Sequence, residues 1–104
     1  MKFVPSRAIV ALIVAGGFAA PALANADLAK KYACLGCHAE DKKLVGPSYN
    51  DIAAKYKGNK EGEAKVLDQI KKGGSGAWGA VPMPPQPTVT DADAKALAQW
   101  ILKR

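Results

Sequence analysis

The segment Cys34-Leu35-Gly36-Cys37-His38 decides the fold, because it holds both cysteines and the only histidine of the 104-residue chain. C-x-x-C-H is the attachment pattern of a c-type haem. The two intervening residues let both sulfurs reach one edge of the porphyrin from a single helical turn, where they form thioethers. His38 then falls under the iron as an axial ligand. We therefore expect the rest of the chain to form a shell around a covalently attached haem.

Other interpretations of the cysteine pair explain less. A structural zinc site needs four ligands, and two cysteines with one histidine fall short of that number. A thioredoxin-like motif needs a βαβ setting, and the sequence contains no strand-rich pattern. A disulfide across two intervening residues would be strained and would leave His38 unexplained.

The first residues are typical of a secretory signal peptide. A basic start precedes an apolar run at 8–20, which is too short for a comfortable membrane span. An A-x-A cleavage site lies at 22–24, and a second possible site lies at 24–26. We expect a cleaved signal peptide at 1–24 and one domain at 25–104; an uncleaved anchor is the alternative.

The predicted mature domain has roughly 80 residues, a size at which a chain buries little surface and often needs a staple or a cofactor. The whole chain has a formal net charge of +6 at pH 7, and the predicted mature part stays positive. This charge can steer an acidic partner. Nucleic acid is an implausible partner for an exported protein that lacks an aromatic and basic groove.

The apolar periodicity predicts an all-α domain without strands. We expect helices over residues 25–33, 48–56, 61–72 and 90–102, with a long irregular loop from 73 to 88. Thr90 is positioned to cap the last helix. The same helix has a predicted buried face made of Ala94, Leu97, Ala98 and Ile101.

Met83 is the candidate for a second iron ligand. It is the only methionine outside the signal segment and lies in Val81-Pro82-Met83-Pro84-Pro85. A thioether suits haem iron, and His/Met ligation raises the reduction potential. The flanking prolines restrict the backbone and lower the entropic cost of holding a weak iron–sulfur bond. Core packing and polyproline recognition are the alternative roles for this segment.

The chain resembles the small bacterial class I c-type cytochromes of the cytochrome c-551/c-552 (c8) group. The matching stretches cover nearly all of the predicted domain in order: Cys34–His38, Leu44–Pro47, Asp51–Tyr56, Ile70–Lys71, Gly76–Gly79, Pro82–Pro85 and Ala96–Leu102. The resemblance implies a small class I cytochrome c fold, with four to five helices wrapped around one covalently attached haem c.

The resemblance also implies residue roles. These are haem thioethers at Cys34 and Cys37, axial iron ligands at His38 and Met83, and haem-site contacts at Pro47 and Trp78. The Pro47 carbonyl would accept a hydrogen bond from His38 Nδ1, and Trp78 would donate its indole N–H to a haem propionate. The alternatives are an ordinary turn proline and a core aromatic.

The glycines at 73, 74, 76 and 79 would let the backbone approach the haem edge. The first and last helices would cross, with Leu28 and Tyr32 meeting Leu97 and Ile101, while Trp100 would belong to the core.

Two positions depart from the family pattern. Gln69 stands where close relatives often carry a basic residue that reaches a propionate. Gln86 stands where they often carry an asparagine whose amide bonds the methionine sulfur. These departures leave the reduction potential, and the contact between Gln86 and Met83, open.

The resulting functional hypothesis is a monomeric periplasmic electron carrier, not an enzyme, that cycles between Fe(III) and Fe(II) without stable membrane insertion. The resemblance implies a quinol-oxidising complex as donor and a terminal oxidase, nitrite reductase or cytochrome c peroxidase as acceptor. We expect transient electrostatic docking at the exposed haem edge. The lysines predicted to surround that edge are Lys30, Lys31, Lys42, Lys43, Lys71 and Lys72.

Two other classes of function compete with this one. A haem sensor or small peroxidatic catalyst needs a free sixth coordination position, which a methionine ligand in a rigid loop would close. A peptide-binding module that uses the proline-rich loop would be colourless.

Overall fold

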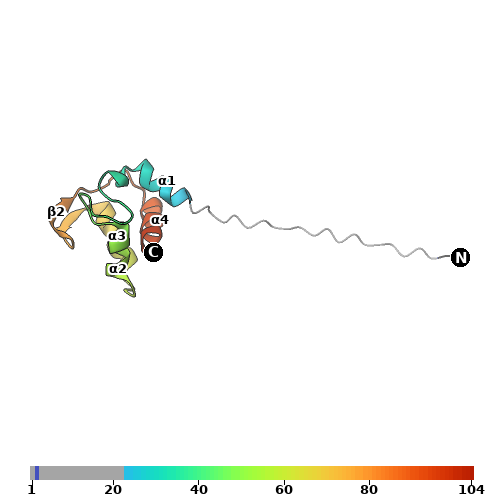
Figure 1. Ribbon diagram of the computed structural model, residues 1–104. Helices are drawn as coiled ribbons and strands as arrows, with labels where there is room; N and C mark the ends of the chain where they lie inside the picture. The colour runs from blue at the N-terminus through green and yellow to red at the C-terminus, as the bar shows by residue number, and fades with distance from the viewer. Residues whose placement is uncertain (1, 3–22) are drawn as a thin grey trace.

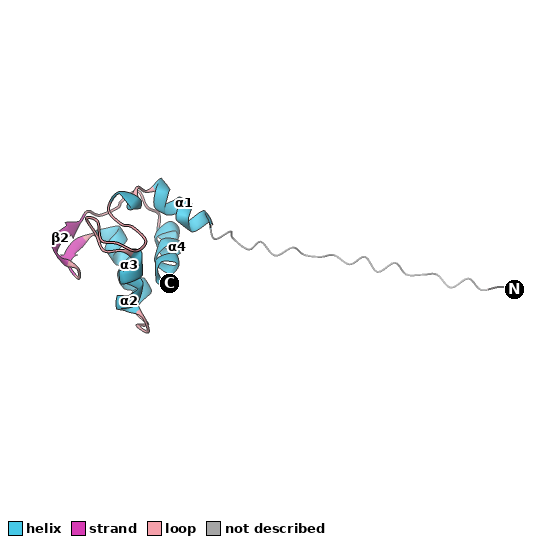
Figure 2. Ribbon diagram, in the orientation of Figure 1, coloured by secondary structure: helices cyan, strands magenta, loops and turns pink. Residues whose placement is uncertain are grey.

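The computed structural model describes Lys2 and residues 23–104, and the chain is mostly helical there (Figure 1). Its elements are α1 (Leu23–Lys31), the 3₁₀ helix η1 (Cys34–Gly36), α2 (Tyr49–Tyr56), α3 (Gly62–Lys72), β1 (Gly74–Gly76), β2 (Gly79–Met83) and α4 (Asp91–Leu102). This part of the chain thus has four α-helices and one small hairpin; the helices are cyan and the strands magenta in Figure 2. The predicted helical fold class is confirmed. The predicted signal segment lies almost entirely outside the described residues.

Local chemistry sets the helix boundaries. The hydroxyl of Ser48 accepts a hydrogen bond from the Asp51 amide at 3.1 Å, and Thr90 does the same for the Asp93 amide at 3.1 Å. Both residues are therefore N-caps, as predicted for Thr90. Helix α1 ends two residues before its predicted end, because Ala33 adopts a left-handed conformation with φ 58°. An α-helix cannot continue through that conformation.

The core forms where α4 packs against the other three helices. The predicted buried face of α4 is confirmed, since Ala94, Leu97, Ala98 and Ile101 are all buried. Helix α1 packs on α4 as expected, with the small residue Ala29 fully buried. Leu28 of α1 and Tyr32, which directly follows α1, pack against this core, and the Tyr32 hydroxyl donates to Asp93 Oδ2 at 2.5 Å.

The prediction that the domain has no strands is wrong in one place. β1 and β2 pair as an antiparallel hairpin, with Gly74 opposite Met83 and Gly76 opposite Gly79. In Figure 1 this hairpin lies on the far side of the molecule from α1. Its backbone depends on the positive φ of glycines, for example 119° at Gly74 and 108° at Gly76. Exposed strands of this kind carry no alternation of apolar and polar residues, so hydropathy could not reveal them.

None of the described helices is long and apolar enough to cross a membrane.

Candidate functional site

The C-x-x-C-H segment forms a tight turn that points three reactive side chains into one cavity. The amides of Cys37 and His38 both donate to the Cys34 carbonyl, at 3.2 and 3.0 Å. The resulting turn places Cys34, Cys37 and His38 together in the cavity lining. No disulfide joins Cys34 and Cys37, and burial raises the pKa of the Cys34 thiol. Two thiols and an imidazole thus line the same cavity, as the spacing predicts.

The His38 ring has a fixed orientation. Its Nδ1 atom lies 2.7 Å from the Pro47 carbonyl oxygen, so Nδ1 carries the proton and donates to that oxygen. Nε2 is then left with its lone pair, the form of imidazole that binds a metal. Gly46 packs directly against the ring, since a Cβ at this position would lie 2.5 Å from His38 Cε1. The hydrogen bond between His38 and Pro47 that the resemblance implies is therefore present.

Met83 reaches the same cavity from the end of β2. Its segment is anchored to the end of α3, where the Gln86 amide donates to the Ile70 carbonyl at 3.0 Å. Gly73 makes the close approach possible. A Cβ there would collide with the Met83 carbonyl oxygen and lie 2.6 Å from the Pro85 nitrogen, and its φ of +65° already favours glycine. The backbone on both sides of Met83 is thus held against α3.

Trp78 lines the cavity as well, from the turn between β1 and β2. The contact between its indole and a haem propionate stays a prediction. Lys55 of α2 lies over the indole, with Nζ 4.6 Å from the ring centroid, and donates to the Ala77 carbonyl at 2.6 Å. Lys55 therefore fixes the turn that presents Trp78.

The two glutamines that depart from the family pattern both donate side-chain hydrogen bonds to nearby backbone carbonyls. Gln69 lines the cavity, and its Nε2 donates to the Gly74 carbonyl at 3.0 Å. The Nε2 of Gln86 donates to the Pro84 carbonyl at 3.2 Å. In this structure the Gln86 amide therefore bonds the backbone next to Met83, and the site differs from the arrangement in which an amide bonds the sulfur.

Only one of the six lysines predicted around the haem edge, Lys43, lies in the lining of this cavity. Lys71 was predicted at the haem edge, but its ammonium group contacts other residues of the protein. Its Nζ donates to the Val89 carbonyl at 2.6 Å and lies 3.0 Å from Asp91 Oδ1. Lys71 therefore joins α3 to the start of α4. The loop after Cys37 exposes apolar and basic residues together, with Leu44 and Val45 following Lys42 and Lys43 in the sequence.

Sequence reasoning missed Tyr49, which lines the cavity while being only 2% exposed. Its ring stacks on His38, with centroids 5.7 Å apart and planes 24° apart. Burial raises the pKa of the Tyr49 hydroxyl to about 12. Helical periodicity could have found this residue, because Tyr49 precedes the buried Ile52 and Ala53 by three and four positions.

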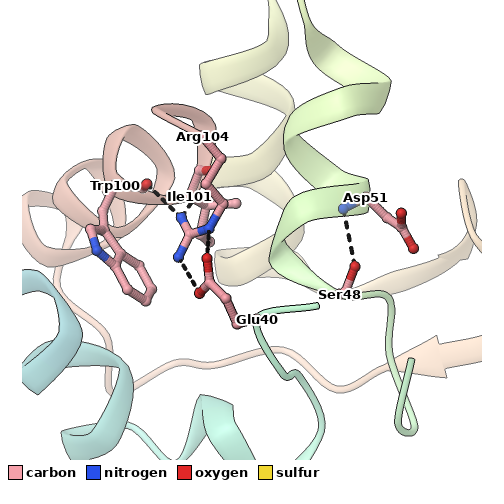
Figure 3. Close-up of polar contacts among 6 residues, drawn as sticks. All are labelled: Glu40, Ser48, Asp51, Trp100, Ile101 and Arg104. Carbon is pink, nitrogen blue, oxygen red and sulfur yellow. Dashed lines mark hydrogen bonds and ion pairs between the residues drawn. The ribbon is translucent and has the colours of Figure 1, made fainter. Parts of the chain in front are cut away.

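The Arg104–Glu40 ion pair was also missed. Arg104 Nε lies 2.6 Å from Glu40 Oε1, and Nη2 lies 2.7 Å from Oε2 (Figure 3). Hydrogen bonding from Arg104 holds the pKa of the Glu40 carboxyl below its usual value. No local pattern indicates this pair, because its members stand 64 positions apart in the sequence.

The cavity suits a large apolar ring with a bound metal. Aliphatic side chains form part of its wall, and they come from Val45, Ile52, Val66, Ile70, Leu97 and Ile101. Two thiols line the cavity and can bind a ring covalently, while one imidazole and one thioether are donors that suit haem iron. The buried Tyr49 hydroxyl has no hydrogen-bond partner among the described residues. No cluster of three or more His, Cys, Asp or Glu side chains suited to a metal occurs in that part of the chain. Iron inside a macrocycle fits these residues better than a metal held by the protein alone.

A small helical shell with these donors around one apolar cavity defines the class of c-type haem proteins. Comparison with known proteins agrees, since the family model described as cytochrome c matches residues 23–104. The chain is 54% identical to cytochrome c-552 of Hydrogenobacter thermophilus over 91 residues, which cover 88% of this chain and 92% of that protein. It is 47% identical to cytochrome c-551 of Pseudomonas aeruginosa, over 74% of this chain and 73% of that protein.

The fold comparison gives the same answer. The crystal structure of wild-type Nitrosomonas europaea cytochrome c552 superposes with a TM-score of 0.72 at 55% identity, covering 74% of this chain and 95% of that one. The chain therefore belongs to the cytochrome c family. It is a small c-type cytochrome that carries electrons on one covalently bound haem c.

Proposed function

We propose that this cytochrome transfers single electrons between redox proteins of the periplasm, on a haem attached at Cys34 and Cys37 and ligated by His38 and Met83. The observation that carries this proposal is that all four side chains line one cavity. When bound, the haem iron supplies an Fe(III)/Fe(II) couple.

His38 would act as a strong and well-oriented ligand. The hydrogen bond from Nδ1 to the Pro47 carbonyl at 2.7 Å leaves Nε2 for the iron and increases the electron density on the ring. Gly46 supports the same orientation by leaving room for the ring. The imidazole would then keep one position during the change of oxidation state.

Met83 would supply a soft neutral ligand and close the sixth position. The Gly73 contact and the hydrogen bond between Gln86 and Ile70 hold its backbone against α3. A ligand on so constrained a segment moves little when the iron changes charge, and small reorganisation favours fast electron transfer. A closed sixth position also leaves no place for a substrate or a gas, so we propose no catalytic activity.

Electron exchange would occur at the edge beside Cys37. This cysteine is exposed, and the apolar residues Leu35, Leu44 and Val45, which lie near it in the sequence, are exposed too. Lys42 and Lys43 are exposed in the same loop. We propose a contact that is apolar at its centre and basic at its margin, suited to brief encounters with acidic partners. A quinol-oxidising complex as donor and a terminal oxidase, nitrite reductase or peroxidase as acceptor remain the proposed partners.

Substitution of the sixth ligand tests this function. In the purified holoprotein with Met83→Ala, the near-infrared band of oxidised Met-ligated haem should disappear, and the reduced form should bind carbon monoxide. Val81→Ala is the matched control, because Val81 lines the same cavity but carries no donor atom. Carbon monoxide binding by the unaltered reduced protein, with no near-infrared band, would favour a haem sensor or catalyst.

Location and partners need separate experiments. Expression of the full chain with and without residues 1–24, followed by fractionation, should yield haem-loaded protein in the periplasm only when that segment is present. Stopped-flow oxidation of the reduced protein by each candidate acceptor, at several salt concentrations, should show electron transfer that slows as salt rises. Rates that do not depend on salt would contradict electrostatic docking.

A further inference from the structure

Arg104 follows α4 by two residues, and its guanidinium lies between Glu40 and the last turn of α4 (Figure 3). Nε and Nη2 donate to the two carboxylate oxygens of Glu40, at 2.6 and 2.7 Å. Nη1 donates to the carbonyls of Trp100 and Ile101, at 2.7 and 3.1 Å. All three guanidinium nitrogens are thus engaged, and the side chain is only 15% exposed.

The same guanidinium covers a column of rings that leads to His38. It lies 4.4 Å from the centroid of the Trp100 ring and 5.1 Å from that of the Tyr49 ring. The edge of Trp100 packs on Tyr49, with centroids 5.2 Å apart. Tyr49 in turn stacks on His38. A single ring therefore separates Arg104 from the imidazole.

Glu40 belongs to the segment that leaves His38. The Tyr49 amide donates to the Ala39 carbonyl at 2.9 Å, and the Asn50 amide donates to the Glu40 carbonyl at 3.1 Å. The backbone after His38 is thereby bound to the start of α2. The carboxylate of Glu40 binds the same backbone to the end of α4, through Arg104.

We propose that Arg104 and Glu40 are positioning residues for His38. Their forked ion pair fixes the segment after the ligand and keeps water away from the Tyr49–His38 stack, so that the imidazole keeps one orientation in both oxidation states. This inference rests on the proposed function only in taking His38 as an iron ligand. Arginine is required, because its planar fork binds both carboxylate oxygens while its face covers the aromatic rings.

A positioning role and a simple charge effect predict different reduction potentials. By charge alone, loss of Arg104 favours Fe(III) and loss of Glu40 favours Fe(II), so the two changes shift the potential in opposite directions. If the pair acts by position, either change opens the same fork and admits water to the stack. Water favours the more highly charged oxidised centre, so both changes then lower the potential.

The experiment compares holoproteins with Arg104→Ala, Arg104→Lys and Glu40→Gln by spectroelectrochemistry and by the NMR shifts of the haem methyl groups in the oxidised state. These shifts report the orientation of the axial ligands. Lys103→Ala is the matched control, because Lys103 is exposed and its loss removes the same charge next to the fork. We expect both fork-breaking changes to lower the potential and to move the same methyl signals. Arg104→Lys should resemble Arg104→Ala, and Lys103→Ala should resemble the unaltered protein.

Opposite shifts in potential for Arg104→Ala and Glu40→Gln would overturn the proposal. So would an Arg104→Lys protein with unaltered potential and methyl shifts. If Arg104→Ala fails to fold, Arg104→Lys and Glu40→Gln decide the matter, since each preserves the size of its side chain closely. Failure of the proposed function itself would be visible first, as an unaltered protein without a low-spin haem ligated by histidine and methionine.

Discussion

Gly46 provides the sharpest test of how the site is built, because its lack of a side chain makes room for the His38 ring. In Gly46→Ala the new Cβ would lie 2.5 Å from Cε1, 2.9 Å from Nδ1 and 3.1 Å from Nε2 of His38. Carbon atoms in contact are ordinarily about 3.5–4.0 Å apart. The imidazole therefore has to retreat by about 1 Å, or the loop that carries Gly46 has to move by the same amount.

Either movement breaks the contact that orients the ring. The distance from Nδ1 to the Pro47 oxygen is 2.7 Å, and a retreat of about 1 Å takes it beyond hydrogen-bonding range. Overpacking costs about 1–3 kcal/mol, and a lost hydrogen bond costs about 0.5–1.5 kcal/mol. The free energy of unfolding should therefore fall by about 2–4 kcal/mol, which lowers the Tm of a domain this size by roughly 10–30 °C.

The assay is thermal unfolding of the oxidised holoprotein, followed by haem absorbance and circular dichroism, with a redox titration alongside. The reduction potential should rise, because an imidazole that loses its hydrogen bond is a weaker donor to Fe(III). Gly36→Ala is the control within the same motif, since a Cβ there meets nothing within 4 Å. Equal Tm values and equal potentials for the two variants would refute the reasoning.

Three further predictions concern backbone conformation and capping. Ala33→Gly should raise the free energy of unfolding by about 0.5–1 kcal/mol, because glycine relieves the left-handed strain at φ 58°; a lower midpoint in urea would contradict this. Gly73→Ala should weaken the near-infrared band of the proposed iron–Met83 bond, because its Cβ collides with the carbonyl of that residue, and an unchanged band would show that the loop adapts. Thr90→Ala should cost about 0.5–2 kcal/mol in chemical unfolding and leave the haem spectrum unaltered, since the hydroxyl caps α4 and lies outside the cavity lining.

The helices were predictable because their signals are local. The apolar stripe of α4 repeats every three to four residues, and Thr90 precedes it with a capping hydroxyl. The β1–β2 hairpin was not predictable in the same way. Its pairing depends on positive φ at Gly74, Gly76 and Gly79, and glycine permits such angles without requiring them. The end of α1 was missed for a related reason, since nothing in the sequence signals that Ala33 adopts a left-handed conformation.

In the site, too, the residues with local sequence signals were predictable and the contacts between distant residues were not. Cys34, Cys37 and His38 are neighbours in the sequence, so their meeting in one cavity follows from a single turn. The hydrogen bond that Lys71 makes could not be predicted, because its acceptor is the backbone carbonyl of Val89. Every residue has such a carbonyl, so the sequence gives no sign of the pairing. The pairing of Arg104 with Glu40 depends on how α4 packs against α2. Sequence patterns and the family resemblance thus identified the groups proposed to bind the iron and the Pro47 contact that orients His38, and they missed the contacts made by Tyr49, Lys71 and Arg104.

The cavity and the hydrophobic core share their walls, and this links stability to oxidation state. Ile52, Ile70 and Leu97 are buried in the core and also line the cavity. A group bound there is therefore part of what holds the helices together, which matters in a domain too small to bury much surface by itself. By linkage, the oxidation state in which the proposed iron–Met83 bond is stronger should have the more stable fold. A soft thioether favours Fe(II) over Fe(III), so reduction should stabilise the protein. For this one-electron couple, the gain in free energy of unfolding should equal the Faraday constant times the difference in reduction potential between the folded and unfolded chains.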